Sequence, residues 1–487
     1  ERQDIALNQN QTNPARWEGL HEVVRMAWPI MLGAMSWVIM DFVDKIFVSR
    51  LGVDNLAAIG SAGIWAYTLG VFFVGIAGCV STFSAQSLGR GNRENCSRFA
   101  WQGIYISIAA SSMVLLIWPL SQPLFERMGH APEVVELELT YFRIRVLGFA
   151  FIAWQAALAG FFQSINRPII PMYAALAANV TNVVLDYVLI FGKLGAPALG
   201  IAGAAIATVV SIAFQAVLLQ AIFMGKAVDR EYGSRRTWRF DWVKMRDLFA
   251  IGWPSGVSGF LDVASWSIFT SFIVGGFGTV QLAAHTAAIS FMHLTFIPAM
   301  ALGMATTPIV GRWIGRGDIR TAKSRAYTAT RLAIVFMVII GATLAILGPY
   351  LMRVFSSDPE VIGLGYSLLI LAAIFAGFDA ITIVLAGALR GAGDTRWMMI
   401  TLSIGAYGVA LPLAWLFAHP MGLGARGAWI GETIYIILLS GVFLKRFHGE
   451  AWRDIRIFSE DRLPEPQLAA ASEAMADESE QGDTTTR

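Results

Sequence analysis

Unbroken apolar runs of about 20 residues recur along the whole chain, and they constrain the fold more than any other feature of the sequence. A helix of that length crosses the hydrocarbon core of a bilayer, whereas a barrel strand needs only about ten alternating residues. The predicted spans are 28–48, 57–80, 99–119, 139–160, 169–191, 200–224, 249–274, 282–308, 331–350, 361–387, 397–418 and 425–445. With 56% hydrophobic and 14% charged residues, the 487-residue chain is also too apolar for a soluble protein. We therefore expect an all-α polytopic membrane protein with twelve transmembrane helices.

The second half of the sequence repeats the first at a nearly constant offset. "WP" at 28 recurs at 253, and "LAA" at 56 recurs at 282. "LGRGNRENCSRF" at 88, "HAPEV" at 130 and "LGIAGAAIAT" at 199 recur in altered form at 314, 357 and 423. Each half would hold six spans, an even number, so both halves enter the membrane from the same side as a parallel repeat. We expect two six-helix lobes facing a central cavity, the arrangement that alternating access requires.

The repeat divides the chain into lobes and polar segments. We expect an N-terminal cytoplasmic tail at 1–18, an N-lobe at 19–225, a basic cytoplasmic connector at 226–248 and a C-lobe at 249–447. Residues 448–487 are rich in polar and acidic residues, a composition typical of a disordered tail.

Lys and Arg are unevenly distributed between the two sets of loops. The loops after spans two, four, six, eight and ten hold eighteen of them, and the other loops hold five. Because basic loops stay on the cytoplasmic side, both termini are expected in the cytoplasm. Topology accounts for the basic residues, so we expect no nucleic-acid partner.

A few carboxylates lie inside the apolar runs, where an ionised group must face a cavity, bind a cation or be protonated. Asn182 and Asp186 are one helical turn apart and share one helix face. With a carboxylate from the first span, either Asp44 or Asp41, this face would suit a small cation or two carboxylates that share a proton. The alternatives are a polar pair that only joins helices and, for Asp44, an interfacial salt bridge with Lys45.

The second half carries Asp262 in the seventh span and Asp379 in the tenth, each without a basic residue within one helical turn. Two carboxylates that face a cavity would bind a proton, a sodium ion or a cationic substrate. A buried protonated acid is the alternative. His285 on the eighth span is a candidate proton relay, although a lone His on an apolar helix is more often a structural residue.

Motifs for ATP hydrolysis and for metal-dependent hydrolysis are absent from the sequence. It contains no GxxxxGK[ST] segment and no HExxH segment. We therefore expect no enzyme and no cofactor, and an ion gradient as the energy source.

Six segments resemble one known family, and the resemblance covers residues 20–447. They are "WPIMLGAMSWVIMDFVDKIFVSRLG", "LAAIG", "AQSLGRGN", "NVVLDYVLIFG", "LGIAGAAIAT" and "LAGALRGAGDT". These are similar to the motifs of the multidrug and toxic compound extrusion (MATE) transporters. The resemblance implies two lobes in a V shape and export of organic, mostly cationic compounds and drugs in exchange for H⁺ or Na⁺. It also implies a monomer in the lipid bilayer of a bacterial inner membrane.

The resemblance assigns roles to the polar residues of the first half. "VDKIFVSRLG" places Asp44, rather than Asp41, at the first-helix carboxylate of the family. "NVVLD" places Asn182 and Asp186 at its fifth-helix partners, and Thr208 falls at the sixth-helix hydroxyl. Together they would hold Na⁺ or a proton in the N-lobe.

The second half resembles a different branch of the family. Asp262 and Asp379 match acids of the norfloxacin-exporter branch, whereas the N-lobe motif is similar to that of the DNA-damage-inducible branch. This mixture leaves the coupling ion open between H⁺ and Na⁺. A lipid-linked oligosaccharide flippase of the same superfamily is the alternative function, and it should carry more cationic residues inside the cavity.

Overall fold

The structure is a computed structural model that describes residues 12–128 and 130–462, and these contain helices and no strand. The helices of the first half are α2 (Thr12–Ser49), α3 (Val53–Gly78), α4 (Val80–Gly89), α5 (Arg93–Ser112), α6 (Val114–Glu126), α7 (Pro132–Leu147), α8 (Phe149–Ser164), α9 (Ile169–Phe191) and α10 (Ile201–Phe223). Next come α11 (Lys226–Tyr232), α12 (Trp242–Ile268), η1 (Phe269–Val274), η2 (Gly275–Phe277), α13 (Thr279–Gly315), α14 (Ile319–Met352), α15 (Pro359–Ala392), α16 (Thr395–Gly405), η3 (Ala406–Ala410), α17 (Leu411–Ala418), α18 (Gly424–His448) and η4 (Ser459–Arg462). The all-α prediction is confirmed.

Every predicted span falls on one helix or on consecutive helices of the structure. Within the described ranges, nine helical segments are long and apolar enough to cross a membrane, and two pairs bent by 41° raise the number to eleven. The third predicted span, 99–119, falls on α5 and α6, which a turn at Met113 separates, and it is not among these eleven. The first of these helices, α5, also carries the polar residues Asn95, Arg98 and Gln102, which lower its mean hydropathy.

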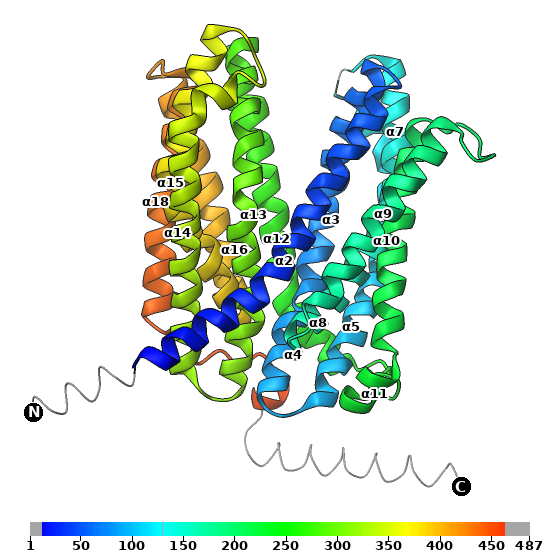
Figure 1. Ribbon diagram of the computed structural model, residues 1–487, viewed down its shortest axis with the longest axis vertical. Helices are drawn as coiled ribbons and strands as arrows, with labels where there is room; N and C mark the ends of the chain where they lie inside the picture. The colour runs from blue at the N-terminus through cyan, green and yellow to red at the C-terminus, as the bar shows by residue number, and fades with distance from the viewer. Residues whose placement is uncertain (1–11, 129, 463–487) are drawn as a thin grey trace, which may run out of the picture.

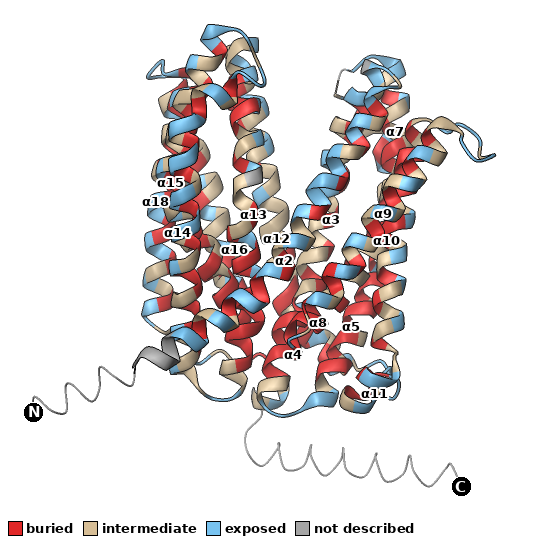
Figure 2. Cartoon of the chain, in the orientation of Figure 1, coloured by how far each residue is buried: buried red, intermediate tan, exposed pale blue. Residues whose placement is uncertain are grey.

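Two bundles form a V, with α3–α10 in one lobe and α12–α18 in the other, and α2 crosses from the lower end of the second bundle to the first (Figure 1). Figure 1 shows the lobes meeting at the end where α2 begins and α18 ends, and diverging at the opposite end. We call these the meeting end and the open end. Buried residues concentrate toward the meeting end (Figure 2). Each lobe has its own apolar core, around Phe83 and Phe142 in the first and Trp429 and Phe443 in the second.

Glycines allow the two lobes to approach closely where α3 packs against α12. A Cβ atom added at Gly75 would lie 2.6 Å from the Cα atom of Gly256. Hydrogen bonds to backbone carbonyls also join the lobes nearby. Thr82 Oγ1 donates to the carbonyl of Arg390 at 2.9 Å, and Gln86 Nε2 donates to the carbonyl of Gly391 at 2.9 Å.

Helix α2 contacts both lobes. Val23, Met26 and Ile30 in its first half pack in one core cluster with residues of α13, α14 and α15, and its later turns pack against α9. Glu22 accepts hydrogen bonds from Arg312 at 2.6 Å and from Arg325 at 2.8 Å. The start of this helix is therefore attached to the C-lobe by both apolar and ionic contacts.

The chain after α18 returns from the second lobe to the first at the meeting end. Phe458 packs against Phe83 and Phe99 of the first lobe. Arg90 donates two hydrogen bonds to Asp461, at 3.0 and 2.6 Å. The predicted tail of 448–487 therefore contains a packed part within 448–462, where aromatic and ionic contacts compensate for the polar composition, while 463–487 lie outside the described residues.

The internal repeat is visible in the local structure of two equivalent turns. Gly91 and Gly317, which occupy equivalent positions in the two halves, have positive φ angles of 81° and 79°. At the next position, Asn92 Oδ1 accepts from the backbone N–H of Asn95, and Asp318 Oδ1 accepts from that of Thr321. Both turns thus start the following helix with the same type of cap.

Candidate functional site

One face of α9 brings the two polar residues of the fifth span into the first lobe. Ala174, Ala178, Asn182, Asp186 and Ile190 are buried at every fourth position, the spacing that forms a single helix face. Asn182 and Asp186 are both completely buried. Small alanines on the same face allow neighbouring helices to approach these side chains.

The first and sixth spans supply the remaining groups of this N-lobe cluster. With its NH₂ group facing the carboxylates, Asn182 donates to Asp44 Oδ1 at 2.8 Å and to Asp186 Oδ2 at 3.3 Å. Thr208 Oγ1 on α10 lies 3.4 Å from Asp44 Oδ2 and donates to the carbonyl of Ala204. The structure therefore brings together the four N-lobe residues Asp44, Asn182, Asp186 and Thr208.

The N-lobe cluster is a buried acidic site with incomplete hydrogen bonding. Asp186 Oδ1 has no hydrogen-bond partner among the described residues. Arg145 on α7 is near enough for its charge to act on Asp44 and Asp186, although it forms no ion pair with either. Two buried carboxylates cannot both keep an uncompensated charge, so this arrangement can hold a proton or a small cation. Arg145 was not among the residues predicted from the sequence for this site.

Asp41 lies outside the N-lobe cluster. Its Oδ2 is 2.6 Å from Lys45 Nζ, and about half of each side chain is exposed. Asp44 is 5% exposed by comparison. Lys45 therefore forms its ion pair with Asp41, and Asp44 remains available to the cluster.

The two predicted acids of the second lobe have different surroundings. Asp262 on α12 is exposed and lines a small pocket between α12, η3, α17 and α18. Asp379 on α15 is partly buried and does not line this pocket, although the charges of the two acids influence each other. No ion pair among the described residues includes either carboxylate.

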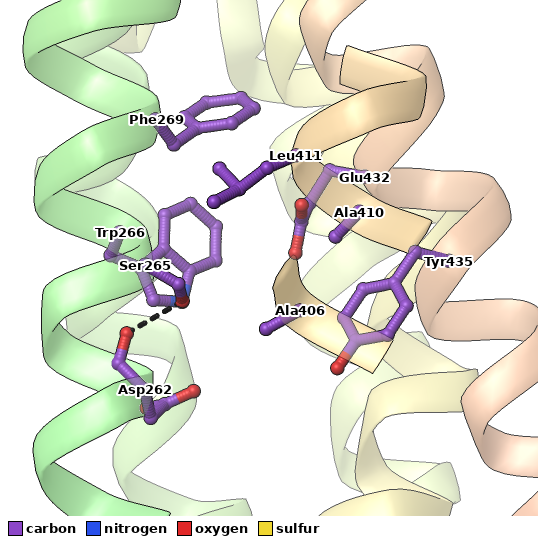
Figure 3. A pocket seen from close by; sticks show the side chains of 9 residues that line it. All are labelled: Asp262, Ser265, Trp266, Phe269, Ala406, Ala410, Leu411, Glu432 and Tyr435. Carbon is purple, nitrogen blue, oxygen red and sulfur yellow. Dashed lines mark hydrogen bonds between the residues drawn. The ribbon is translucent and has the colours of Figure 1, made fainter. Parts of the chain in front are cut away.

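A third carboxylate, Glu432, belongs to the same pocket. It lies on α18, is 8% exposed and lines the pocket with Ser265, Tyr435 and Asp262 (Figure 3). Glu432 was not among the site residues predicted from the sequence. The signal was present, because Glu432 is an acid inside a predicted span and occupies the position of the second half that corresponds to Thr208 in the first.

His285 is completely buried and both of its ring nitrogens have partners. Trp429 Nε1 donates to Nδ1 at 3.0 Å, and Nε2 lies 3.0 Å from Thr270 Oγ1. Because an indole nitrogen can only donate, Nδ1 accepts and Nε2 carries the proton of a neutral imidazole. This arrangement favours a structural role, and the proton relay remains a prediction.

No group of three or more His, Cys, Asp and Glu side chains in the described ranges is arranged to hold a metal ion. The N-lobe cluster instead offers two carboxylates, an amide and a hydroxyl, and the C-lobe pocket offers two carboxylates and two hydroxyls. Such mixed sets of hard oxygen atoms suit a proton or a monovalent cation.

Comparison with known proteins shows similarity over most of the chain. The family model MatE matches twice, at residues 29–188 and 254–416. A "Probable multidrug resistance protein NorM" of Bradyrhizobium diazoefficiens is 31% identical over 432 residues, 88% of this chain and 92% of that protein. A "Multidrug resistance protein NorM" of Burkholderia vietnamiensis is 29% identical over 433 residues, 88% of this chain and 93% of that protein.

A solved structure has the same fold. It is described as the "Outward-facing conformation of a multidrug resistance MATE family transporter of the MOP superfamily". The TM-score is 0.83 at 22% identity, with 90% of this chain and 97% of the other covered. The V-shaped arrangement is thus shared with a known fold, and the two matches of the family model fall on the two halves of the internal repeat.

Proposed function

The chain belongs to the MatE family of transporters, and from this premise we propose that it exports drugs and other organic, mostly cationic compounds in exchange for H⁺ or Na⁺. The observation that carries this proposal is the buried N-lobe cluster, in which two carboxylates share one amide donor. A protein that only needed stability would gain little from two buried acids that form no ion pair. A cation that enters and leaves gives these acids a function.

The coupling site is proposed to be the N-lobe cluster of Asp44, Asn182, Asp186 and Thr208. Binding of H⁺ or Na⁺ neutralises the pair of carboxylates and stabilises the packing of α2, α9 and α10 around them. Release of the ion restores the repulsion between Asp44 and Asp186. The ion thereby changes the relative stability of two arrangements of the lobes, 19–225 and 249–447.

The organic cation is proposed to bind between the lobes, beside Asp262. This carboxylate is exposed on α12, which packs against α3 of the first lobe. The charge of Asp262 acts on Tyr67 of α3, whose ring centroid lies 5.9 Å from that of Trp37 on α2. An acid beside exposed aromatic rings provides both the charge and the flat surfaces that an aromatic cation prefers.

The direction of transport is proposed from the distribution of Lys and Arg, which puts both termini in the cytoplasm of a bacterial cell. The meeting end then faces the cytoplasm and the open end faces outward, across the inner membrane. Each positive charge that moves inward through 100 mV in excess of the charge exported with the substrate contributes about 2.3 kcal/mol, enough to sustain roughly a fifty-fold gradient of substrate. We propose that a monomer performs the cycle, because each chain contains both lobes.

Export of a lipid-linked oligosaccharide is not favoured for this chain. An anionic diphosphate substrate requires basic side chains in the cavity. The described pocket of the second lobe is lined by acids and no Lys or Arg, and the N-lobe cluster also centres on acids.

Transport by the reconstituted full chain tests the proposed function. Proteoliposomes would carry ethidium and receive an imposed Na⁺ gradient, an imposed pH gradient or neither. We expect ethidium to move against its own gradient under one of the two ion gradients, which also names the coupling ion. Movement only down the ethidium gradient would indicate a channel and contradict the proposal.

A further inference from the structure

A small cavity in the second lobe lies next to both the lobe interior and the space between the lobes. Its volume is about 20 Å³, whereas one buried water needs roughly 10–15 Å³ measured in the same way. It is lined by apolar side chains that include Trp266, Phe269 and Leu411, and by four polar residues. The cavity therefore has room for a water molecule or a small cation, and it is far too small for an organic drug.

Glu432 is the buried carboxylate that points into this cavity. Figure 3 shows Glu432 and Tyr435 reaching from α18, and Asp262 and Ser265 from α12, into the space between the helices. Glu432 is more than nine-tenths buried, and no hydrogen bond or ion pair satisfies its carboxylate among the described residues. An ionised carboxylate in these surroundings requires a positive partner.

The internal repeat gives independent support for a ligand role at this position. Glu432 in "LGARGAWIGE" is the counterpart of Thr208 in "LGIAGAAIAT", since each is the last residue of its matching segment. Thr208 is the α10 residue that faces Asp44 in the N-lobe cluster. The equivalent position in the second lobe therefore also faces a buried polar site, and it carries a carboxyl group in place of a hydroxyl.

Two π-helical turns border the same cavity. Phe269 comes from η1, and Ala406 and Ala410 come from η3. Such turns break the regular hydrogen bonding of a helix and occur frequently at functional sites. Here they widen α12 and the helix of α16 and α17 beside the carboxylates.

We propose that Glu432 and Asp262 together bind a small monovalent cation, Na⁺ or a hydrated proton, with Tyr435 and Ser265 as neutral oxygen ligands. This inference rests on the proposed function and adds a ligand and a ligand size to it. The carboxylate of Asp379 does not line the cavity, although its charge acts on Glu432.

Asp262 connects the cation to the organic substrate. Its side chain lines the cavity and is also exposed toward the other lobe, whereas Glu432 is buried. A small cation held by both acids neutralises the negative charge that an organic cation would need at Asp262. The two ligands therefore compete for Asp262, and only the small cation reaches Glu432.

Direct ion binding to the purified full chain in detergent tests this proposal. Binding of ²²Na⁺ and release of protons on addition of ethidium would be measured for wild type, Glu432→Gln and the control Glu360→Gln, an exposed residue at the start of α15. If the ion is Na⁺, binding at the cavity should weaken at least about tenfold in Glu432→Gln, the loss expected when a cation loses one charged ligand. Fewer Na⁺ ions should then bind per protein than in wild type, while the N-lobe cluster keeps its own ion. If the ion is H⁺, wild type should bind no ²²Na⁺ and Glu432→Gln should release fewer protons. The control should match wild type.

Ethidium affinity in the absence of the coupling ion separates misfolding from a loss of ion binding. Glu432→Gln should bind ethidium within about threefold of wild type, because the cavity excludes the drug. If Glu432→Gln does not fold, Tyr435→Phe decides the question, and an unchanged ion affinity in that variant overturns the proposal. Ion binding by Glu432→Gln equal to that of wild type also overturns it and leaves the proposed function intact. A wild type that neither binds Na⁺ nor releases protons refutes the proposed coupling itself.

Discussion

Replacing Gly75 by alanine should shift the balance between the two arrangements of the lobes. The new Cβ atom would lie 2.6 Å from Gly256 Cα, 2.7 Å from Gly256 N and 2.9 Å from the carbonyl carbon of Ser255. All three are backbone atoms, so no side chain can rotate away. Carbon atoms in good contact are about 3.5–4.0 Å apart, so α3 and α12 must separate by roughly 1 Å.

The energetic cost of this separation falls on the described conformation, in which α3 and α12 are in contact. Overpacking by one methyl group costs about 1–3 kcal/mol, which corresponds to roughly a 5- to 150-fold change in a population ratio. When the lobes rock as rigid bodies, a larger separation between them at the meeting end goes with a smaller separation at the open end. Gly75→Ala should therefore increase the population of molecules whose open end is closed.

The distance between spin labels at the open end measures this shift. Leu194 and Val354 are 89% and 77% exposed in loops of the first and second lobes, so cysteines there would be labelled. The native Cys79 and Cys96 are buried. We expect Gly75→Ala to add a shorter distance to the distribution, whereas Gly60→Ala on the same helix, with no atom within 4 Å of the added Cβ, should not. Identical distributions for the two variants would refute the reasoning.

Three further predictions follow from particular contacts. Asp186→Asn should lower ion-driven ethidium export in proteoliposomes at least tenfold, because one of two buried carboxylates is lost; export equal to that of wild type would exclude the N-lobe cluster as the coupling site. Arg90→Asp should increase the population with a closed open end, and the exchange Arg90→Asp with Asp461→Arg should reverse it in the same spin-label measurement, because the pair, at 2.6 Å, attaches the chain that follows α18 to the first lobe. His285→Leu should lower thermal stability by about 1–3 kcal/mol by leaving the indole N–H of Trp429 unpaired, while proton-driven transport remains within about threefold; a selective loss of proton-driven transport would support the relay instead.

The positions of the helices were predictable because a bilayer selects for apolar length. The interruptions inside the spans were not. The break at Met113, the bend at Gly148 and the π-helical turns η1 and η3 leave no comparable pattern in hydropathy. They depend on how each helix packs against its neighbours, and a single sequence does not record that packing directly.

The N-lobe cluster was predictable in part, because a spacing of one helical turn places Asn182 and Asp186 on one face. The choice between Asp41 and Asp44 was harder, since both lie on nearly the same side of α2. The structure separates them through tertiary contacts: Asp41 pairs with Lys45, and Asp44 meets the helices α9 and α10.

The role of Glu432 as an acid inside a span could be predicted from the sequence. The size of the cavity beside it could not. The two halves have different residues at this position, threonine in the first and glutamate in the second, so a match of identical residues does not mark it. Comparing polar character within each span would have selected it. The cavity volume of about 20 Å³, which decides what Glu432 can bind, follows only from packing in three dimensions.

Competition between the ion and the drug in the purified protein tests the central claim most directly. The fluorescence anisotropy of bound ethidium would be titrated with NaCl at constant pH and with acid at constant Na⁺, for wild type and Asp186→Asn. If the ion binds better to one arrangement of the lobes and the drug binds better to the other, linkage requires that the ion weaken the binding of the drug. We predict that one of the two ions raises the apparent Kd for ethidium in wild type, and that this effect is reduced in Asp186→Asn. An ethidium affinity that neither ion changes would contradict coupled exchange by this protein.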